Sequence, residues 1–122
     1  AMKSYQKSIR LDPAYAKAYY NMGRVYADKG DLNNAVSYYQ RALKLQPGAA
    51  EIHFVLGAVL ARQGRLEEAT DHFREAVKLR PDSADIHASL GRALAEQGKK
   101  EEAARHYQEA IRILKPAGKK DK

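Results

Sequence analysis

The sequence of 122 residues contains no cysteine. Disulfide bonds and thiolate chemistry, whether nucleophilic or metal-binding, are therefore excluded. The sequence also has no stretch close to the ~20 apolar residues that a membrane-spanning helix requires, so we expect no membrane insertion. No secretory signal is evident, because residues 1–13 have the pattern of an amphipathic helix. These absences name no compartment, and the cytoplasm is only the default expectation.

The charge balance is basic but only moderately so. Lys and Arg number 22 against 15 Asp and Glu, which gives a formal net charge of +7. The segment 115–122 holds four lysines and one aspartate and so contributes +3 of this excess, and we expect residues 118–122 to form a disordered basic tail. In the remainder, acids and bases alternate along the chain. This mixture predicts a soluble surface, with a basic patch for nucleic acid as the less favoured alternative.

The strongest signal is an internal repeat with a period of 34 residues. Glycine, alanine, proline and aromatic residues all recur with this step: Gly23, Gly57 and Gly91; Gly30, Gly64 and Gly98; Ala35, Ala69 and Ala103; Ala42, Ala76 and Ala110; Pro13, Pro47 and Pro81; Tyr5, Tyr39, Phe73 and Tyr107. Such periodicity is typical of a fold that stacks one small unit. We expect a half repeat at 1–15 and full repeats at 16–49, 50–83 and 84–117.

Each repeat predicts two helices. In the first repeat, Tyr19, Met22 and Tyr26 recur at helical spacing and form one apolar face. Gly30 and Asp31 then interrupt the helix, and a second apolar face follows over 32–45. The acidic pairs Glu67–Glu68 and Glu101–Glu102 open the second helices of the later repeats, and Asp82 or Ser83 is the expected N-cap of the helix after Pro81.

Glycine recurs in the middle of each first helix, at Gly23, Gly57 and Gly91. Glycine costs a helix interior about 1 kcal/mol relative to alanine, so its recurrence at one register calls for a compensating contact. We expect that contact to be the close approach of the second helix near Ala35, Ala69 and Ala103.

These residues resemble the tetratricopeptide repeat family. The family's pattern of Leu-Gly, Ala, an aromatic residue, Ala and a closing Pro is met in the middle repeat by Leu56, Gly57, Leu60, Ala69, Phe73, Ala76 and Pro81. The resemblance extends over about 1–117 and implies an all-α, right-handed solenoid of antiparallel helical hairpins. His53 and His87 depart from the pattern, since they stand where the family often has tryptophan.

The first helix of each repeat has a second face that is not committed to its partner helix. The resemblance implies that this face lines a concave groove, in which proteins of the family bind peptides. The candidate groove residues combine aromatic and apolar side chains with arginines and neutral donors: Lys17, Tyr20, Asn21, Arg24, Phe54, Val55, Arg62, Ser89 and Arg92. Arginine suits carboxylates, and aromatics with arginine commonly anchor interfaces. We therefore expect a protein-interaction module that binds a peptide segment of a partner protein.

Other interpretations remain open. The arginines of this face could instead pair with Asp28, Asp85 or Glu96 on neighbouring turns. The carboxylate clamp of chaperone adaptors is not matched, because Val55, Asp85 and other residues occupy its positions. Residues 1–12 resemble the second helix of a unit whose first helix is missing. The chain would then be a piece of a longer solenoid, or its open ends would pair in a self-assembling scaffold that is a homo-oligomer.

Four histidines suggest a metal site, yet their spacing argues against one. By the repeat they pair as His53 with His87 and His72 with His106, one unit apart. Packed helix layers are separated by about 10 Å, whereas metal ligands lie within ~2.0–2.1 Å of one ion. We therefore expect packing or surface roles and no metal. No arrangement typical of nucleophilic or acid–base catalysis is recognisable, so we expect neither enzymatic activity nor a cofactor.

Overall fold

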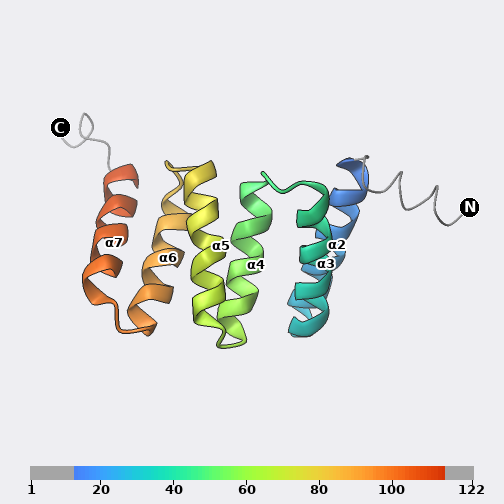
Figure 1. Ribbon diagram of the computed structural model, residues 1–122, viewed down its shortest axis with the longest axis horizontal. Helices are drawn as coiled ribbons and strands as arrows, with labels where there is room; N and C mark the ends of the chain where they lie inside the picture. Colours follow the sequence, from blue (N-terminus) through green and yellow to red (C-terminus); the bar gives the residue numbers. More distant parts are fainter. Residues whose placement is uncertain (1–12, 115–122) are drawn as a thin grey trace, which may run out of the picture.

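The computed structural model describes residues 13–114, which form six helices and no strand. The helices are α2 (Pro13–Asp28), α3 (Leu32–Leu45), α4 (Ala50–Arg62), α5 (Leu66–Leu79), α6 (Ala84–Glu96) and α7 (Lys100–Leu114). They pack as three hairpins, α2 with α3, α4 with α5 and α6 with α7, stacked in a row (Figure 1). The predicted all-α solenoid is confirmed. None of the helices within 13–114 has the length and apolarity to cross a membrane.

The first helix differs from its expected start. The sequence predicts a first full repeat from residue 16, whereas α2 begins at Pro13. Proline is tolerated in the first helical turn, because the N–H it lacks would have no partner inside the helix. The helix expected within 1–12 and the tail expected at 118–122 lie outside the described residues.

Each hairpin turn is built around one glycine in the left-handed region of backbone conformation. Gly30, Gly64 and Gly98 have φ angles of 83°, 83° and 85°. In the first turn, Gly30 N–H donates to the carbonyl of Ala27 and Asp31 N–H donates to that of Tyr26, at 3.0 and 2.9 Å. These two bonds close the helix end with a Schellman motif, which needs glycine at the left-handed position. The interruption predicted at Gly30 is therefore a sharp reversal of the chain.

Side-chain caps and acidic first turns mark the starts of several helices. Asp31 is the N-cap of α3, and its side chain accepts a hydrogen bond from Asn34 N–H. Of the two candidates after Pro81, Ser83 is the N-cap of α6 and accepts from Ile86 N–H. The paired glutamates lie in the first turns of α5 and α7, where their charge suits the helix dipole.

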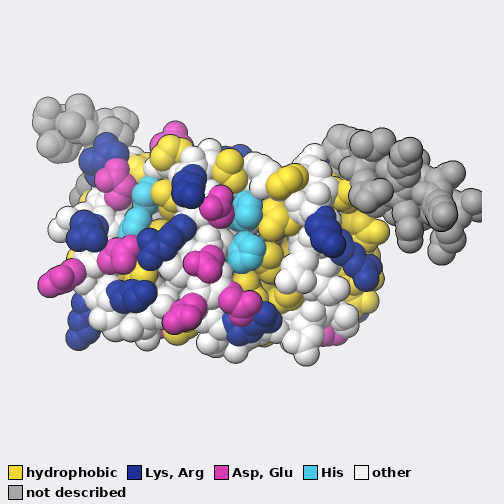
Figure 2. Space-filling view, viewed as in Figure 1, with side chains coloured by type: hydrophobic (Ala, Val, Ile, Leu, Met, Phe, Trp, Pro, Cys, Tyr) yellow, Lys and Arg dark blue, Asp and Glu magenta, His cyan; other side chains and the backbone are white. Residues whose placement is uncertain are grey.

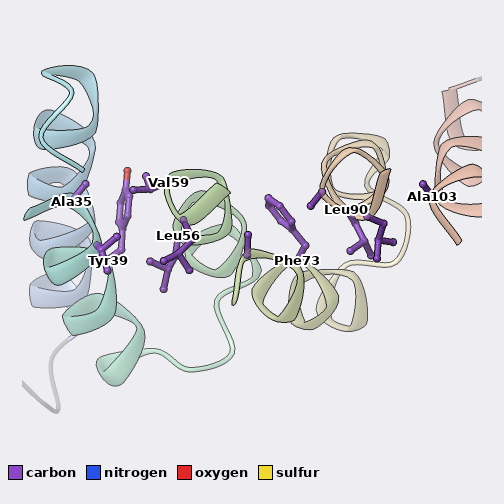
Figure 3. Close-up of a cluster of buried hydrophobic side chains, with 12 residues drawn as sticks. Ala35, Tyr39, Leu56, Val59, Phe73, Leu90 and Ala103 are labelled. Carbon is purple, nitrogen blue, oxygen red and sulfur yellow. The ribbon is translucent and has the colours of Figure 1, made fainter. Parts of the chain in front are cut away.

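One continuous core runs along the stack and links the three hairpins (Figure 3). Leucines of α4 and α6 alternate with aromatic side chains of α3 and α5 along it. Its main members are Ala35, Tyr39, Leu56, Leu60, Ala69, Phe73, Leu90, Leu94 and Ala103. Each is buried, so the recurring positions of the sequence are core positions.

The mid-helix glycines face the aromatic rings rather than the alanines. A Cβ added at Gly23 would lie 2.6 Å from the ring of Tyr39, and one at Gly57 would lie 2.8 Å from the ring of Phe73. The second helix supplies the close approach, as expected, but its nearest atoms are those of the rings, four residues after Ala35 and Ala69. Only at Gly91 is the nearest atom the carbonyl oxygen of Ala103, at 3.1 Å, with the Tyr107 ring 3.2 Å away. The rings are planar, so they can lie against a helix backbone that has no side chain.

Met22 is a second departure. It is 40% exposed, whereas Leu56 and Leu90 at the equivalent positions are almost fully buried. Each later first helix packs against the second helix of the preceding hairpin: α4 against α3, and α6 against α5. Among residues 13–114 no helix precedes α2, so this apolar position has no such cover there.

Polar side chains connect successive hairpins at the edges of the core. Arg74 of α5 forms an ion pair of 2.7 Å with Glu102 of α7. Gln97, which follows α6, donates to the hydroxyl of Thr70 at 2.6 Å. Within 13–114, no buried side-chain nitrogen or oxygen is left without a hydrogen-bond partner. The stacking of hairpins is thus fixed by directional contacts as well as by apolar burial.

A further link joins α2 to α4. The hydroxyl of Tyr20 donates a hydrogen bond of 2.8 Å to the carboxylate of Glu51. Burial, together with the adjacent Glu51 carboxylate, raises the pKa of Tyr20 to about 12. Burial also raises the pKa of Tyr39. Both environments favour the neutral phenol.

We expect Gly57→Ala to destabilise the fold by about 1–3 kcal/mol, because the new methyl would overpack the buried Phe73 ring. This cost exceeds the ~1 kcal/mol that alanine contributes as a better helix former. Urea unfolding followed by circular dichroism measures the change. Gly48→Ala is the matched control: a Cβ there meets nothing within 4 Å, so the stability should change by less than about 0.5 kcal/mol. Equal stability of the two variants would contradict the proposed contact.

The raised pKa of Tyr20 predicts a loss of stability at alkaline pH. The unfolded chain ionises this phenol near its ordinary pKa of 10.0, while the raised pKa lets the folded chain hold the proton up to about 12. Its contribution is therefore fully present below pH 10.0 and lost as the pH rises to about 12. In Tyr20→Phe the free energy of unfolding should fall less steeply over this interval, with the slope from Tyr39 retained. Identical slopes for the two proteins would contradict this assignment.

Candidate functional site

The first helices of two neighbouring hairpins, α4 and α6, border a hollow of about 360 Å³. Its lining joins small and aromatic side chains to charged ones: Ala58, Ala61, Arg62, Phe73, Ser89, Arg92, Ala93 and Glu96. Arg62, Ser89 and Arg92 are three of the predicted groove residues, and they come from two different repeats. The structure therefore brings them together around a single space.

The floor of this hollow is apolar because α4 contributes the methyl groups of two alanines to it. Ala58 and Ala61 replace the larger side chains that occupy other turns of the helix, and both pack against the core. Their small size leaves the buried ring of Phe73 within reach of the hollow, although Phe73 belongs to α5. A ligand side chain seated here would contact an aromatic ring and two alanines.

The two arginines differ in their partners. Arg92 is exposed and approaches Glu96 on the same helix at 3.8 Å. Arg62 is exposed, and its guanidinium donates to the main-chain carbonyl of Ala27 at 3.4 Å. The alternative in which the arginines pair with acids on neighbouring turns therefore applies to Arg92. Such exposed pairs are worth little, so either guanidinium can exchange its contact for a ligand carboxylate.

A second hollow, of about 460 Å³, lies between the start of α2 and the start of α4. It is lined by Ala16, Lys17, Tyr20, Gln46, Ala49, Glu51 and Ile52, so it contains two predicted residues, Lys17 and Tyr20. The hydroxyl of Tyr20 is engaged by Glu51, as described above. A ligand in this hollow would meet an aromatic ring, one cation and one carboxylate.

The remaining four predicted residues line neither of these two hollows. Phe54 and Val55 are half-buried and pack against the core, and the Phe54 ring lies 6.0 Å from that of Phe73. Asn21 and Arg24 are exposed on α2. Five of the nine predicted residues thus line two separate hollows, and the other four lie outside both.

Some lining residues were missed from the sequence. Glu51 and Glu96 lie on the stripe formed by the faces of α2, α4 and α6 that carry the predicted groove residues, but they are not among those nine residues. The sequence assigns Phe73 to the core alone. The available signal is the pair of small residues Ala58 and Ala61, which leave a hollow next to this buried ring.

The histidines that meet are not the equivalent residues of successive repeats. His53 lies against His72 and His87 against His106, in each case across the two helices of one hairpin. The step of 34 residues that relates His53 to His87 identifies equivalent positions, whereas the neighbour across a hairpin is 19 residues away. Figure 2 shows these histidines as two separate patches on one face of the molecule.

Comparison with protein families gives matches along the whole stack. Models described as tetratricopeptide repeat match residues 20–84 and 60–111, and a model described as TPR repeat matches residues 1–30. The first of these matches alone extends over more than half of the chain. Among curated proteins, no sequence is similar enough to count as a relative.

Solved structures with the same fold include MamA and the first TPR of Spaghetti (RPAP3). One MamA structure superposes with a TM-score of 0.82 at 25% identity, with 96% of this chain aligned to 68% of that one. A second gives 0.81 at 24% identity, with 98% aligned to 66%, so the chain spans about two thirds of these MamA chains. The first TPR of Spaghetti (RPAP3), bound to HSP90 peptide SRMEEVD, gives 0.82 at 20% identity, with 86% aligned to 83%. The repeat pattern, the stacked hairpins and these matches together show that the chain belongs to the tetratricopeptide repeat family.

Proposed function

We propose that the chain is a protein-interaction module that binds a peptide segment of a partner protein along the faces of α2, α4 and α6. The observation that carries the proposal is the hollow between α4 and α6, in which Arg62, Ser89 and Arg92 surround an apolar floor. The first TPR of Spaghetti (RPAP3), which shares the fold, is bound to a peptide. Shared fold supports a peptide-binding mode, and the chemistry of the peptide follows from the residues present here.

The hollow favours an apolar side chain next to a carboxylate. Phe73 and the two alanines provide a floor that excludes water from an apolar group. Arg62 and Arg92 stand at its edge, and a guanidinium can donate two parallel hydrogen bonds to one carboxylate. Ser89 adds a hydroxyl that can donate to a main-chain carbonyl. A peptide segment presents all three groups, and in this proposal it is bound without being chemically changed.

The charge of the stripe supports a protein partner over nucleic acid. The nine groove residues include the cations Lys17, Arg24, Arg62 and Arg92. The same faces carry the carboxylates Asp28, Glu51, Asp85 and Glu96, so the formal charges cancel. A phosphate backbone is bound through an excess of positive charge, which this stripe lacks.

Self-assembly through the ends of the stack is the second candidate function. On α7, the side chains of Ile111 and Leu114 are 57% and 70% exposed, and Tyr107 is also exposed. On α2, Met22 and Val25 are exposed at the opposite end of the described stack. Apolar side chains gathered on end helices favour contact with a further helix, which a second copy could supply.

The groove proposal predicts that charge reversal at the hollow abolishes binding. A peptide selected from a random display library is labelled, and its affinity is measured by fluorescence polarisation. We expect Arg62→Glu with Arg92→Glu to weaken binding at least about tenfold, because the carboxylate of the peptide would then face the carboxylates of the two introduced glutamates. Arg80→Glu changes a cation outside the lining of the hollow and should leave the affinity unchanged. Failure of the library to yield a binder, or equal effects of both variants, would contradict the proposal.

The assembly candidate predicts a concentration-dependent mass. Light scattering coupled to size exclusion should show oligomers that grow with concentration for the unmodified chain. Ile111→Lys with Leu114→Lys should hold the chain at its monomer mass, because lysine ammonium groups are costly to desolvate in a contact. Gln108→Lys adds charge to an exposed position of the same helix and serves as the control. A monomer at every concentration would exclude this function.

A further inference from the structure

The second hairpin holds a pair of histidines in a fixed arrangement. The Nδ1 atoms of His53, on α4, and His72, on α5, lie 3.1 Å apart. His53 is only 8% exposed, and its Nε2 lies 3.0 Å from the carbonyl oxygen of Pro47. The ring of His53 is therefore held at both nitrogens, while His72 is half-buried at the rim.

The third hairpin repeats this arrangement with different neighbours. The Nδ1 atoms of His87, on α6, and His106, on α7, lie 3.2 Å apart. His87 is 5% exposed, and its Nε2 lies 2.8 Å from the carbonyl oxygen of Pro81. The same geometry thus occurs twice on one face of the protein, which argues for a property of the pair rather than an accident of packing (Figure 2).

The main-chain carbonyl determines the protons of the buried ring. A carbonyl only accepts, so Nε2 of His53 must carry a hydrogen and donate to Pro47. In the neutral ring the lone pair of His53 is then on Nδ1 and points toward His72. A metal-binding histidine is commonly held in the correct tautomer by a backbone carbonyl, which accepts a hydrogen bond from the ring nitrogen that does not bind the metal. With His72 as donor, one proton lies between the two Nδ1 atoms.

We propose that each histidine pair is a binding site for Zn²⁺ or a similar divalent transition-metal ion, which replaces the shared proton between the two Nδ1 atoms. Two nitrogens 3.1–3.2 Å apart and each ~2.0–2.1 Å from one ion subtend an angle of about 100° at it. This angle lies between the right angle of square-planar coordination and the tetrahedral angle. The objection to a metal rests on the distance between repeat-equivalent histidines, and it does not apply to the pairs that meet across a hairpin.

Binding moves one proton and breaks no covalent bond between heavy atoms. The hydrogen on Nδ1 of His72 leaves for solvent, and Nε2 of the same ring takes one up, so both imidazoles stay neutral. The ion lies to one side of the line between the Nδ1 atoms, and the rim ring of His72 turns toward it. Within residues 13–114 no group of three or more His, Cys, Asp or Glu side chains is arranged to hold a metal. Water therefore completes the coordination, and the ion is exchangeable.

The charges around the two histidine pairs differ, and this difference predicts which pair binds the metal ion more tightly. Three acidic side chains, Asp71, Glu68 and Glu75, act on His72. Glu68 is ion-paired with Arg65 and Glu75 with Lys78, so Asp71 leaves one net negative charge there. Around His106, Glu102 is opposed by Arg74 and Arg105, and Glu109 is paired with Arg112, so one net positive charge remains. A divalent cation is therefore attracted more strongly to the first pair. We infer that the site at His53 and His72 binds the ion more tightly than the site at His87 and His106.

The test is calorimetric titration of the full chain with ZnCl₂. The unmodified protein should bind two ions with distinct affinities. His72→Gln should remove the tighter site, His106→Gln the weaker one, and the double variant both; each single variant is the control for the other. Circular dichroism confirms that the variants remain folded, since glutamine at a half-buried rim can still hydrogen bond to the buried histidine.

An independent readout separates a built site from surface binding. Long-range ¹H–¹⁵N spectra of the imidazole rings should show His72 changing from the Nδ1–H to the Nε2–H tautomer as Zn²⁺ is added, while His53 keeps its Nε2–H. Zinc binding that persists in the double variant, unchanged tautomers on saturation, or no binding at all would each overturn the proposal.

Discussion

The stack depends on a contact between the bare backbone of one helix and the flat ring of the next. At Gly23 and Gly57 the absence of a side chain lets the rings of Tyr39 and Phe73 lie where a Cβ would come within 2.6–2.8 Å. This contact sets the separation of the two helices in a hairpin. The rings in turn reach the adjoining helices of the core, so one constraint repeated along the chain orders both the hairpins and their stacking.

The same contact bears on the groove that is proposed on the first helices. The hairpin interface is filled by glycine and an aromatic ring, so exposed residues on other faces of these helices, such as Arg24 and Arg92, take no part in it. Ala58 and Ala61 then leave a hollow in which Phe73, already seated on Gly57, forms part of the floor. One ring therefore serves the hairpin and the groove, and a change at this position would affect stability and binding together.

The sequence predicts the features that depend on local chemistry. Gly30, Gly64 and Gly98 predict the turns, because only glycine readily adopts the left-handed conformation found there. The apolar spacing predicts the helices, and the family resemblance predicts their stacking. Periodicity does not predict which side chains meet. His53 is equivalent to His87 yet contacts His72, and this requires the geometry of the hairpin.

Met22 shows a second limit of the same kind. Its spacing assigns it to the buried face, as it does Leu56, but burial depends on whether another helix covers that face. The candidate site was predicted in part for a related reason. Arg62, Ser89 and Arg92 could be placed on one stripe from their positions. Their separation from Lys17 and Tyr20 into a different hollow depends on the sizes of the side chains between them.

The two hollows offer different electrostatic environments, and this decides where an acidic guest is held. In the hollow between α2 and α4, the carboxylate of Glu51 accepts from Tyr20 and stands beside any ligand that enters. A ligand carboxylate there would meet the like charge of Glu51, and Lys17 would only cancel that repulsion. In the hollow between α4 and α6, two guanidinium groups face one carboxylate, that of Glu96, so a net positive charge remains. A peptide that crosses both would place its acidic group against α4 and α6 and turn a neutral or basic group toward Glu51. In the proposed binding mode, the order of charges on the first helices therefore sets the orientation of the peptide along the stack.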